Sequence, residues 1–149
     1  MAKIEPIEHS FYLPISPDKV YEYLTKSKLL TGWFSERAIV TPKKGGSFQL
    51  FWGEFAMRGK VKEAVAPKKL VIAWIDRFEN AKVFETEARF TLRKKGKGTL
   101  LKITHSGFKS GKKWTVLYGA ISSGWAYYLL NLRSVVEHGT DLRNDFDAL

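Results

Sequence analysis

The sequence predicts an α+β fold in which a curved antiparallel sheet of about six or seven strands wraps around a long C-terminal helix. In the central part of the chain, apolar residues recur at every second position, as in half-buried strands. In the last third they recur at spacings of three and four, as in an amphipathic helix. The 149 residues suit one domain, and no linker or repeat divides them. We therefore expect a single domain over residues 1–149.

The N-terminal part predicts one strand followed by two short helices. The strand covers residues 7–13 and ends at Pro14, which cannot continue a ladder of hydrogen bonds. Ser16 is the expected N-cap of the first helix, because Pro17 suits the first helical turn. The second helix is expected to carry four apolar residues at helical spacing: Leu29, Leu30, Trp33 and Phe34.

The central part predicts a meander of strands. The expected strands cover residues 48–52, 55–62, 70–75, 84–92 and 101–105. Gly45-Gly46 and the basic segment 94–98 supply turn residues next to them. Because consecutive strands are joined by short turns, we expect antiparallel pairing with one solvated face.

The last third predicts the long helix. It is expected to begin near Lys113, to bend around residues 122–124 and to end at Gly139, a residue suited to a helix C-terminus. Its apolar stripe consists of Ile121, Trp125, Tyr128, Leu129, Leu132 and Val136. Such a stripe needs an apolar surface to cover it, and the inner face of the sheet is the one available.

Composition narrows the functional classes. The chain has no Cys, which excludes disulfides, a thiol nucleophile and thiolate metal sites. It shows no signal segment and no apolar run of about 18 residues, so we expect a soluble cytoplasmic protein without membrane insertion. The net charge of +10 allows nucleic acid as a partner. However, the basic residues gather in turns while most aromatic residues face inward, so we expect a solvated surface and no specific nucleic-acid binding.

No constellation of residues predicts catalysis. His9, His105 and His138 lack metal-ligand spacing, and no nucleophile has a partnered base, so we expect no metal, no cofactor and no catalytic residue. An acid–base role would need a titratable group in the interior. Asp76 and Glu54 are the exceptions among the inward residues, but both lie near expected strand ends, where we expect them to be solvated.

The aromatic residues predict the candidate site. Several elements converge on one interior, and either a solid core or a partly open cavity is consistent with their rings. Strand parity makes His105 either a buried histidine satisfied by hydrogen bonds or, with Thr86, a polar ligand contact. Ala88 is a small inward position at which a larger side chain would fill the cavity. The expected ligand-binding residues are Trp33, Phe48, Trp52, Trp74, Phe90, His105, Trp125 and Tyr128.

Several motifs, in this order, cover nearly the whole chain. They are SPDKVY at 16–21, LTGWF at 30–34, GGSF at 45–48, KLVIAW at 69–74, GTLLKITHSGF at 98–108 and the pair Gly124-Trp125. With them the chain resembles the START-like, birch-pollen-allergen-like (SRPBCC) superfamily. Within it, the chain is most similar to the group named after the C-terminal domain of the activator of the heat-shock protein 90 ATPase. The resemblance implies a helix-grip fold with a pocket between the sheet and the long helix.

Three functions stay open at this point. The first is binding of a small apolar molecule in the pocket, by a monomer or a homodimer. The second, implied by the resemblance, is a protein-interaction module that acts on a chaperone or another partner in the stress response. The third is an enzyme that uses the pocket for cyclisation or hydrolysis, which rests on analogy alone.

Overall fold

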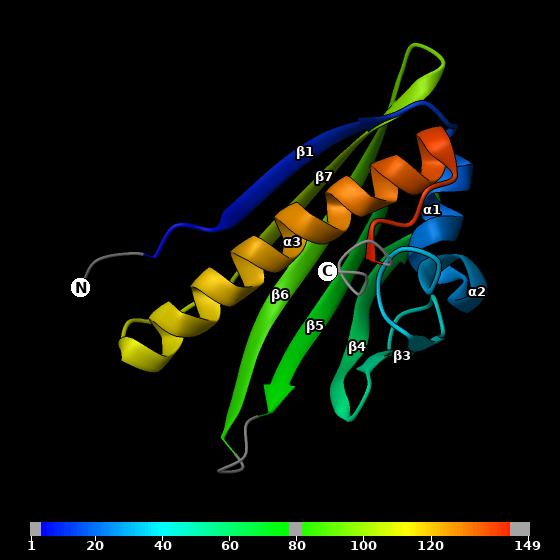
Figure 1. Ribbon diagram of the computed structural model, residues 1–149. Helices are drawn as coiled ribbons and strands as arrows, with labels where there is room; N and C mark the ends of the chain where they lie inside the picture. The colour runs from blue at the N-terminus through cyan, green and yellow to red at the C-terminus, as the bar shows by residue number, and fades with distance from the viewer. Residues whose placement is uncertain (1–3, 78–81, 144–149) are drawn as a thin grey trace.

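The structure is a computed structural model that describes residues 4–77 and 82–143 (Figure 1). Its elements, in chain order, are β1 (Ile7–Leu13), α1 (Pro17–Thr25), α2 (Ser27–Leu30), β2 (Arg37–Val40), β3 (Ser47–Trp52), β4 (Phe55–Val65), β5 (Lys69–Arg77), β6 (Val83–Lys95), β7 (Gly98–Ser106) and α3 (Lys112–His138).

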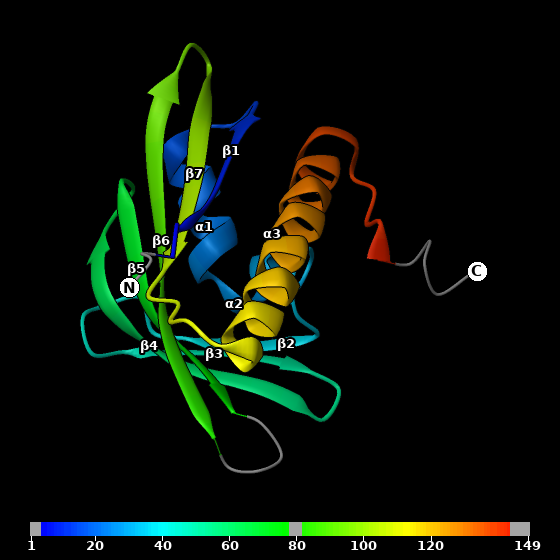
Figure 2. The same ribbon diagram turned by 90° about the vertical axis from the view of Figure 1, so that its left-hand side faces the viewer.

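One seven-stranded antiparallel sheet forms the body of the molecule. Its strand order is β1-β7-β6-β5-β4-β3-β2, so each strand from β2 to β6 pairs with the next one in the chain, and β1 pairs with β7. The sheet curves, and α3 lies along its inner face, with α1 and α2 near one end (Figures 1 and 2). The predicted fold class is therefore confirmed. The short strand β2 was not predicted.

The two short helices follow the prediction at their start and differ from it at their end. Ser16 Oγ accepts a hydrogen bond from the Lys19 N–H at 3.3 Å, and Pro17 opens α1. The prediction that the second helix carries Trp33 and Phe34 is wrong, because α2 stops at Leu30. The backbone carbonyls after Leu30 accept hydrogen bonds from side chains far away in the sequence.

Asn131 and Arg143 supply these side chains. Asn131 Nδ2 donates to the Trp33 carbonyl at 2.9 Å. The Arg143 guanidinium donates to the carbonyls of Thr31 and Phe34, each at 2.8 Å. These bonds hold the segment after α2 against α3 and its C-terminal continuation, and they fix the position of Phe34.

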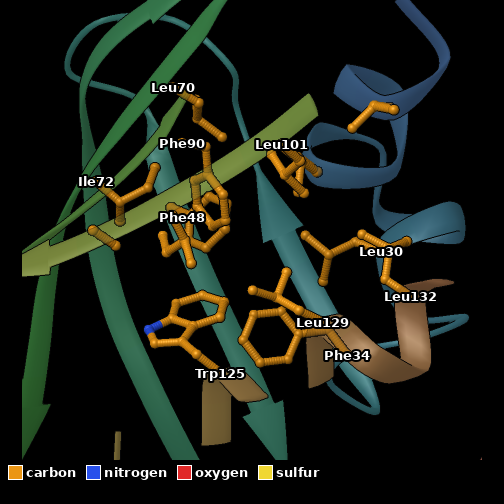
Figure 3. Close-up of a cluster of buried hydrophobic side chains, with 14 of the residues drawn as sticks. Leu30, Phe34, Phe48, Leu70, Ile72, Phe90, Leu101, Trp125, Leu129 and Leu132 are labelled. Carbon is orange, nitrogen blue, oxygen red and sulfur yellow. The ribbon is translucent and has the colours of Figure 1, made fainter. Parts of the chain in front are cut away.

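The main core lies between the inner face of the sheet, the two short helices and the C-terminal half of α3 (Figure 3). Sheet residues such as Phe48 and Phe90 have about 1% of their surface exposed. The predicted stripe on α3 does face inward, because Trp125 and Leu129 are 2% and 1% exposed. The helix ends at Gly139, whose φ of 67° is the left-handed conformation that glycine adopts without strain.

Candidate functional site

A cavity of about 1100 Å³ lies between the N-terminal half of α3 and the inner face of strands β3 to β6. The sheet contributes Trp52, Met57, Trp74 and Phe84 to its walls. On the helix, the lining residues include Ala120 and Gly124. These residues are too small to fill the space, and a Cβ built on Gly124 would meet no atom within 4 Å. The cavity therefore follows from small residues on a helix that faces large rings on a sheet.

Phe34 lies at the centre of the aromatic wall. Its ring centroid is 4.8 Å from that of Tyr128 and 5.3 Å from those of Trp52 and Trp125. Sequence reasoning assigned Phe34 to a helix and did not include it in the site. The long-range hydrogen bonds of Arg143 that fix its backbone leave no local pattern in the sequence.

Asp76 is the buried charged residue of the cavity wall, and the expectation that it is solvated is wrong. Three other charged residues that line the cavity are exposed, namely Arg77, Lys112 and Lys113. The Asp76 side chain is only 6% exposed, and it lies in register with Phe84 of β6. Burial raises its pKa to about 6, against the effect of a hydrogen bond from the Trp74 side chain. Its Oδ2 has no hydrogen-bond partner among the described residues. Glu54, by contrast, is exposed as expected.

A parity argument would have found Asp76. It lies two residues after Trp74 on the same strand, so both side chains point to the same face. The predicted strand ended at residue 75, whereas β5 continues to Arg77. Because the strand is longer than predicted, Asp76 lies within the sheet and not at a solvated end.

His105 has two short hydrogen bonds in the core. Trp125 Nε1 donates to His105 Nδ1 at 2.9 Å, and His105 Nε2 lies 2.6 Å from Thr86 Oγ1. An indole N–H is always a donor, so Nδ1 is unprotonated and the neutral ring carries its proton on Nε2. Burial lowers the pKa of His105 to about 3. The network thus joins α3, β7 and β6 through a histidine that stays neutral at physiological pH.

The eight residues expected to line one space divide into two groups of four. Trp52, Trp74, Trp125 and Tyr128 line the cavity, whereas Trp33, Phe48, Phe90 and His105 lie in the packed core behind it. Periodicity identifies the face on which a side chain lies but not how far along that face the helix covers it. Whether any of the eight contacts a ligand stays a prediction.

Ala88 belongs to the core group as well. It is fully buried and paired with Ile72 on one side and His105 on the other. A larger side chain at this position would overpack the core and would not fill the cavity. The positions that suit a filling substitution are on α3.

The neutral state of His105 predicts a loss of stability in acid. Below about pH 6.5 the unfolded chain takes up a proton at this residue, whereas the folded protein does so only near pH 3. Because the unfolded state binds more protons in this window, the free energy of unfolding falls as the pH falls, by at most about 1.4 kcal/mol per pH unit from this group. The contribution of neutral His105 to the free energy of unfolding is complete above about pH 6.5.

The measurement is urea denaturation at several pH values between 3.5 and 7.5. We expect His105→Leu, which cannot titrate, to show a smaller loss of stability in acid than the parent, although it is less stable at neutral pH. His138→Asn is the matched control, because the side chain of His138 is 71% exposed. Equal acid dependence in the parent and His105→Leu would contradict the neutral assignment.

The described residues show neither a metal-binding cluster nor a helix suited to cross a membrane. Residues 4–77 and 82–143 contain no group of three or more His, Asp or Glu residues arranged to hold a metal ion. Within the same ranges, none of the helices combines the length and the hydrophobicity needed to cross a bilayer.

Comparison with known proteins identifies relatives of the fold. The solution structure of the Aha1 dimer from Colwellia psychrerythraea has a TM-score of 0.78 at 21% identity, and the match covers 92% of this chain and 99% of that chain. An HSP90 activator from Plasmodium falciparum has a TM-score of 0.71 at 23% identity, with 89% and 96% covered. CalU16 from Micromonospora echinospora has a TM-score of 0.71 at 19% identity, with 91% and 75% covered.

These identities are low enough that the three structures show similarity of fold alone. No curated protein matches the chain in sequence. A family model is more informative, because "Activator of Hsp90 ATPase homolog 1-like protein" matches residues 14–137, which include all the elements from α1 to β7 and nearly all of α3. The chain therefore belongs to the Activator of Hsp90 ATPase homolog 1-like protein family.

Proposed function

We propose that the protein binds a small, mainly apolar molecule in the cavity between α3 and the sheet. The observation that carries this proposal is the cavity itself, with its volume of about 1100 Å³ and its wall of aromatic rings. Pockets for small molecules are concave, mostly apolar and contain few polar groups. In this one, Asp76 is the buried polar residue.

The size of the apolar wall sets the expected affinity. A molecule with two fused rings that buries about 200 Å² of apolar surface would gain about 5 kcal/mol from that burial. Loss of translational freedom opposes this gain, and about 5 kcal/mol alone corresponds to about 0.2 mM, so we expect dissociation constants of about 0.2 mM or weaker for simple probes. A native ligand that fills more of the cavity would bind more tightly.

Filling the cavity from the helix side tests the proposal. Gly124 lines the cavity and has free space where a side chain would begin, so we expect Gly124→Leu to occupy that space without a clash. The affinity for the apolar dye N-phenyl-1-naphthylamine, followed by its fluorescence, should fall at least about tenfold. Leucine favours a helix over glycine by about 0.8 kcal/mol, so the variant should stay folded.

Gly119 provides the matched control on the same helix. A Cβ at Gly119 also meets no atom within 4 Å, but this residue does not line the cavity. Gly119→Leu should therefore gain the same helix propensity and keep the parent's affinity. If Gly124→Leu binds the dye as well as Gly119→Leu does, the dye binds elsewhere and the proposal is contradicted.

A protein-interaction function of co-chaperone type is the second candidate. The family model, named after activators of the Hsp90 ATPase, favours it. The mouth of the cavity also exposes Phe55 and Val116, at 47% and 68%, and exposed apolar groups of this kind occur at protein interfaces. Stimulation of the ATPase rate of a purified Hsp90 by this chain would support this function. We expect Val116→Lys to reduce the stimulation while Gly124→Leu leaves it intact.

An enzymatic function receives less support. Asp76 gives the cavity a titratable group, which acid–base chemistry requires. Its Oδ2 has no hydrogen-bond partner among the described residues, so no base or nucleophile there is paired with it. We therefore infer binding and no reaction.

A further inference from the structure

We propose that Asp76 is the polar contact of the cavity, and that the bound molecule presents an N–H or O–H donor to Asp76 Oδ2. This inference rests on the proposed ligand-binding function and deepens it. It defines the ligand by its chemistry, as an apolar body with a hydrogen-bond donor at the end that enters the cavity.

The position of Asp76 carries the inference. The side chain lines the cavity and is 94% buried, and its strand neighbours on the same face of the sheet are Trp74 and Phe84. The Trp74 side chain donates one hydrogen bond to the carboxyl, while Oδ2 has no partner in the described part of the chain. A buried acceptor without a partner is destabilising, whereas a donor from a ligand would satisfy it.

The charges around the carboxyl favour a donor over an acceptor. Arg77, Lys112 and Lys113 also line the cavity, but all three residues are exposed, whereas Asp76 is buried. Lys112 and Lys113 lie at the exposed start of α3. None of these three cations is among the causes that set the pKa of Asp76. At neutral pH the carboxyl is therefore mostly ionised and not neutralised by an ion pair, which makes it a strong acceptor for a charge-assisted hydrogen bond.

Packing alone does not account for this residue. An apolar side chain between Trp74 and Phe84 would match its surroundings, and a carboxylate there lowers stability because burial penalises its charge. Groups that reduce stability inside a cavity are typical of functional sites, where the compensating interaction comes from the ligand.

The experiment compares three probes that share a naphthalene body. They are 2-naphthylmethylamine, 2-naphthalenemethanol and 2-ethylnaphthalene, of which only the first two carry a donor. Calorimetric titration at pH 7.5 should show that the parent binds at least one donor probe at least about tenfold more tightly than the ethyl compound, since hydrogen bonds to charged groups are the stronger ones. A preference shared by both donor probes indicates a hydrogen bond that needs no charge on the ligand, and one confined to the amine indicates an ion pair.

Two substitutions at Asp76 test whether its carboxyl group causes the preference for donor probes. Asp76→Leu removes the acceptor and should abolish the preference or reverse it. Asp76→Asn keeps an acceptor oxygen without the charge, so it should keep part of the preference for the alcohol and lose any excess for the amine. Glu85→Gln is the control, because Glu85 is an exposed carboxylate on the outer face of β6 and should not affect binding. Thermal melting checks that each variant is folded, and Asp76→Asn alone decides the result if Asp76→Leu does not fold.

Three results would overturn the inference. If the parent binds all three probes equally, the cavity binds apolar molecules but Asp76 selects no donor, so the proposed function stands alone. If the preference persists in both Asp76 variants, another group provides the contact. If the parent binds no probe at all, the proposed function fails together with the inference.

Discussion

Asp76→Asn is expected to increase the free energy of unfolding at pH 7 by about 2–3 kcal/mol. The pKa of Asp76 is about 6 in the folded protein, against a reference value of 3.8. A difference of about two pKa units corresponds to about 3 kcal/mol between the two protonation states. Asn resembles the protonated carboxyl in shape and carries no charge, so it avoids this loss.

The gain in stability from Asp76→Asn should depend on pH. Between about pH 3.8 and 6 the folded protein keeps a proton on Asp76 that the unfolded chain has released. Stability from this group is therefore complete below about pH 3.8 and is lost as the pH rises through 6. The Asn variant should gain stability at pH 7 and gain little or nothing at pH 3.5.

Chemical denaturation of the parent and the variant at these two pH values checks the expectation. His105 lowers the stability of both proteins equally in acid, so the comparison at each pH isolates Asp76. Glu85→Gln should change stability by less than about 0.5 kcal/mol at either pH, as is usual for a surface substitution. An equal effect at both pH values would mean that folding does not raise the pKa of Asp76, and a loss of stability at pH 7 would mean that its carboxylate has a favourable partner in the folded protein.

This experiment bears on the function as well as on stability. A residue whose replacement stabilises the protein is not kept for folding, and its position in the cavity wall suggests what it is kept for. The two tests are independent, because the stability gain needs no ligand and the donor preference needs no knowledge of stability. Agreement between them would assign both effects to the Asp76 carboxyl group.

Periodicity predicted the fold because the core of this protein is built from regular elements. The alternation around Trp74 and Phe90 placed both rings on the inner face, and the helical spacing placed Trp125 opposite them. β2 escaped prediction because it has only four residues, and its inner positions, Ala38 and Val40, are half-buried and make a weak pattern.

The site was harder to predict than the fold because it depends on long-range contacts. Phe34 is fixed by hydrogen bonds from Arg143, more than a hundred residues away, to the carbonyls of Phe34 and Ser35. The division between cavity wall and core depends on where a space remains between α3 and the sheet. This space separates Trp52 from Phe48, although both lie on the same face of β3. Strand parity would have placed Asp76 on the inner face, but the predicted strand ended one residue before it, so Asp76 was assigned to a solvated strand end.

Trp125 joins the cavity wall to the core, and its loss is expected to destabilise the protein most. Its ring centroid lies 5.3 Å from that of Trp74 and 5.5 Å from that of Phe90. Trp125→Ala would remove these contacts, so we expect a cost of about 3–5 kcal/mol. It would also leave His105 Nδ1 without its donor, which places the cost in the upper part of this range. Tyr128→Ala, at a half-buried wall position, should cost less.

Trp125→Phe separates the two contributions. The phenyl ring keeps most of the packing but cannot donate to His105, so the expected cost is about 1–3 kcal/mol for an unsatisfied buried acceptor. Urea denaturation at pH 7.5 of Trp125→Phe, His105→Leu and the double variant forms a thermodynamic cycle. Because the two side chains share one hydrogen bond, we expect the double variant to be more stable than the sum of the single effects predicts, by about 0.5–3 kcal/mol. Strict additivity would contradict the bond between Trp125 and His105, and with it the assignment of His105 as a neutral link between helix and sheet.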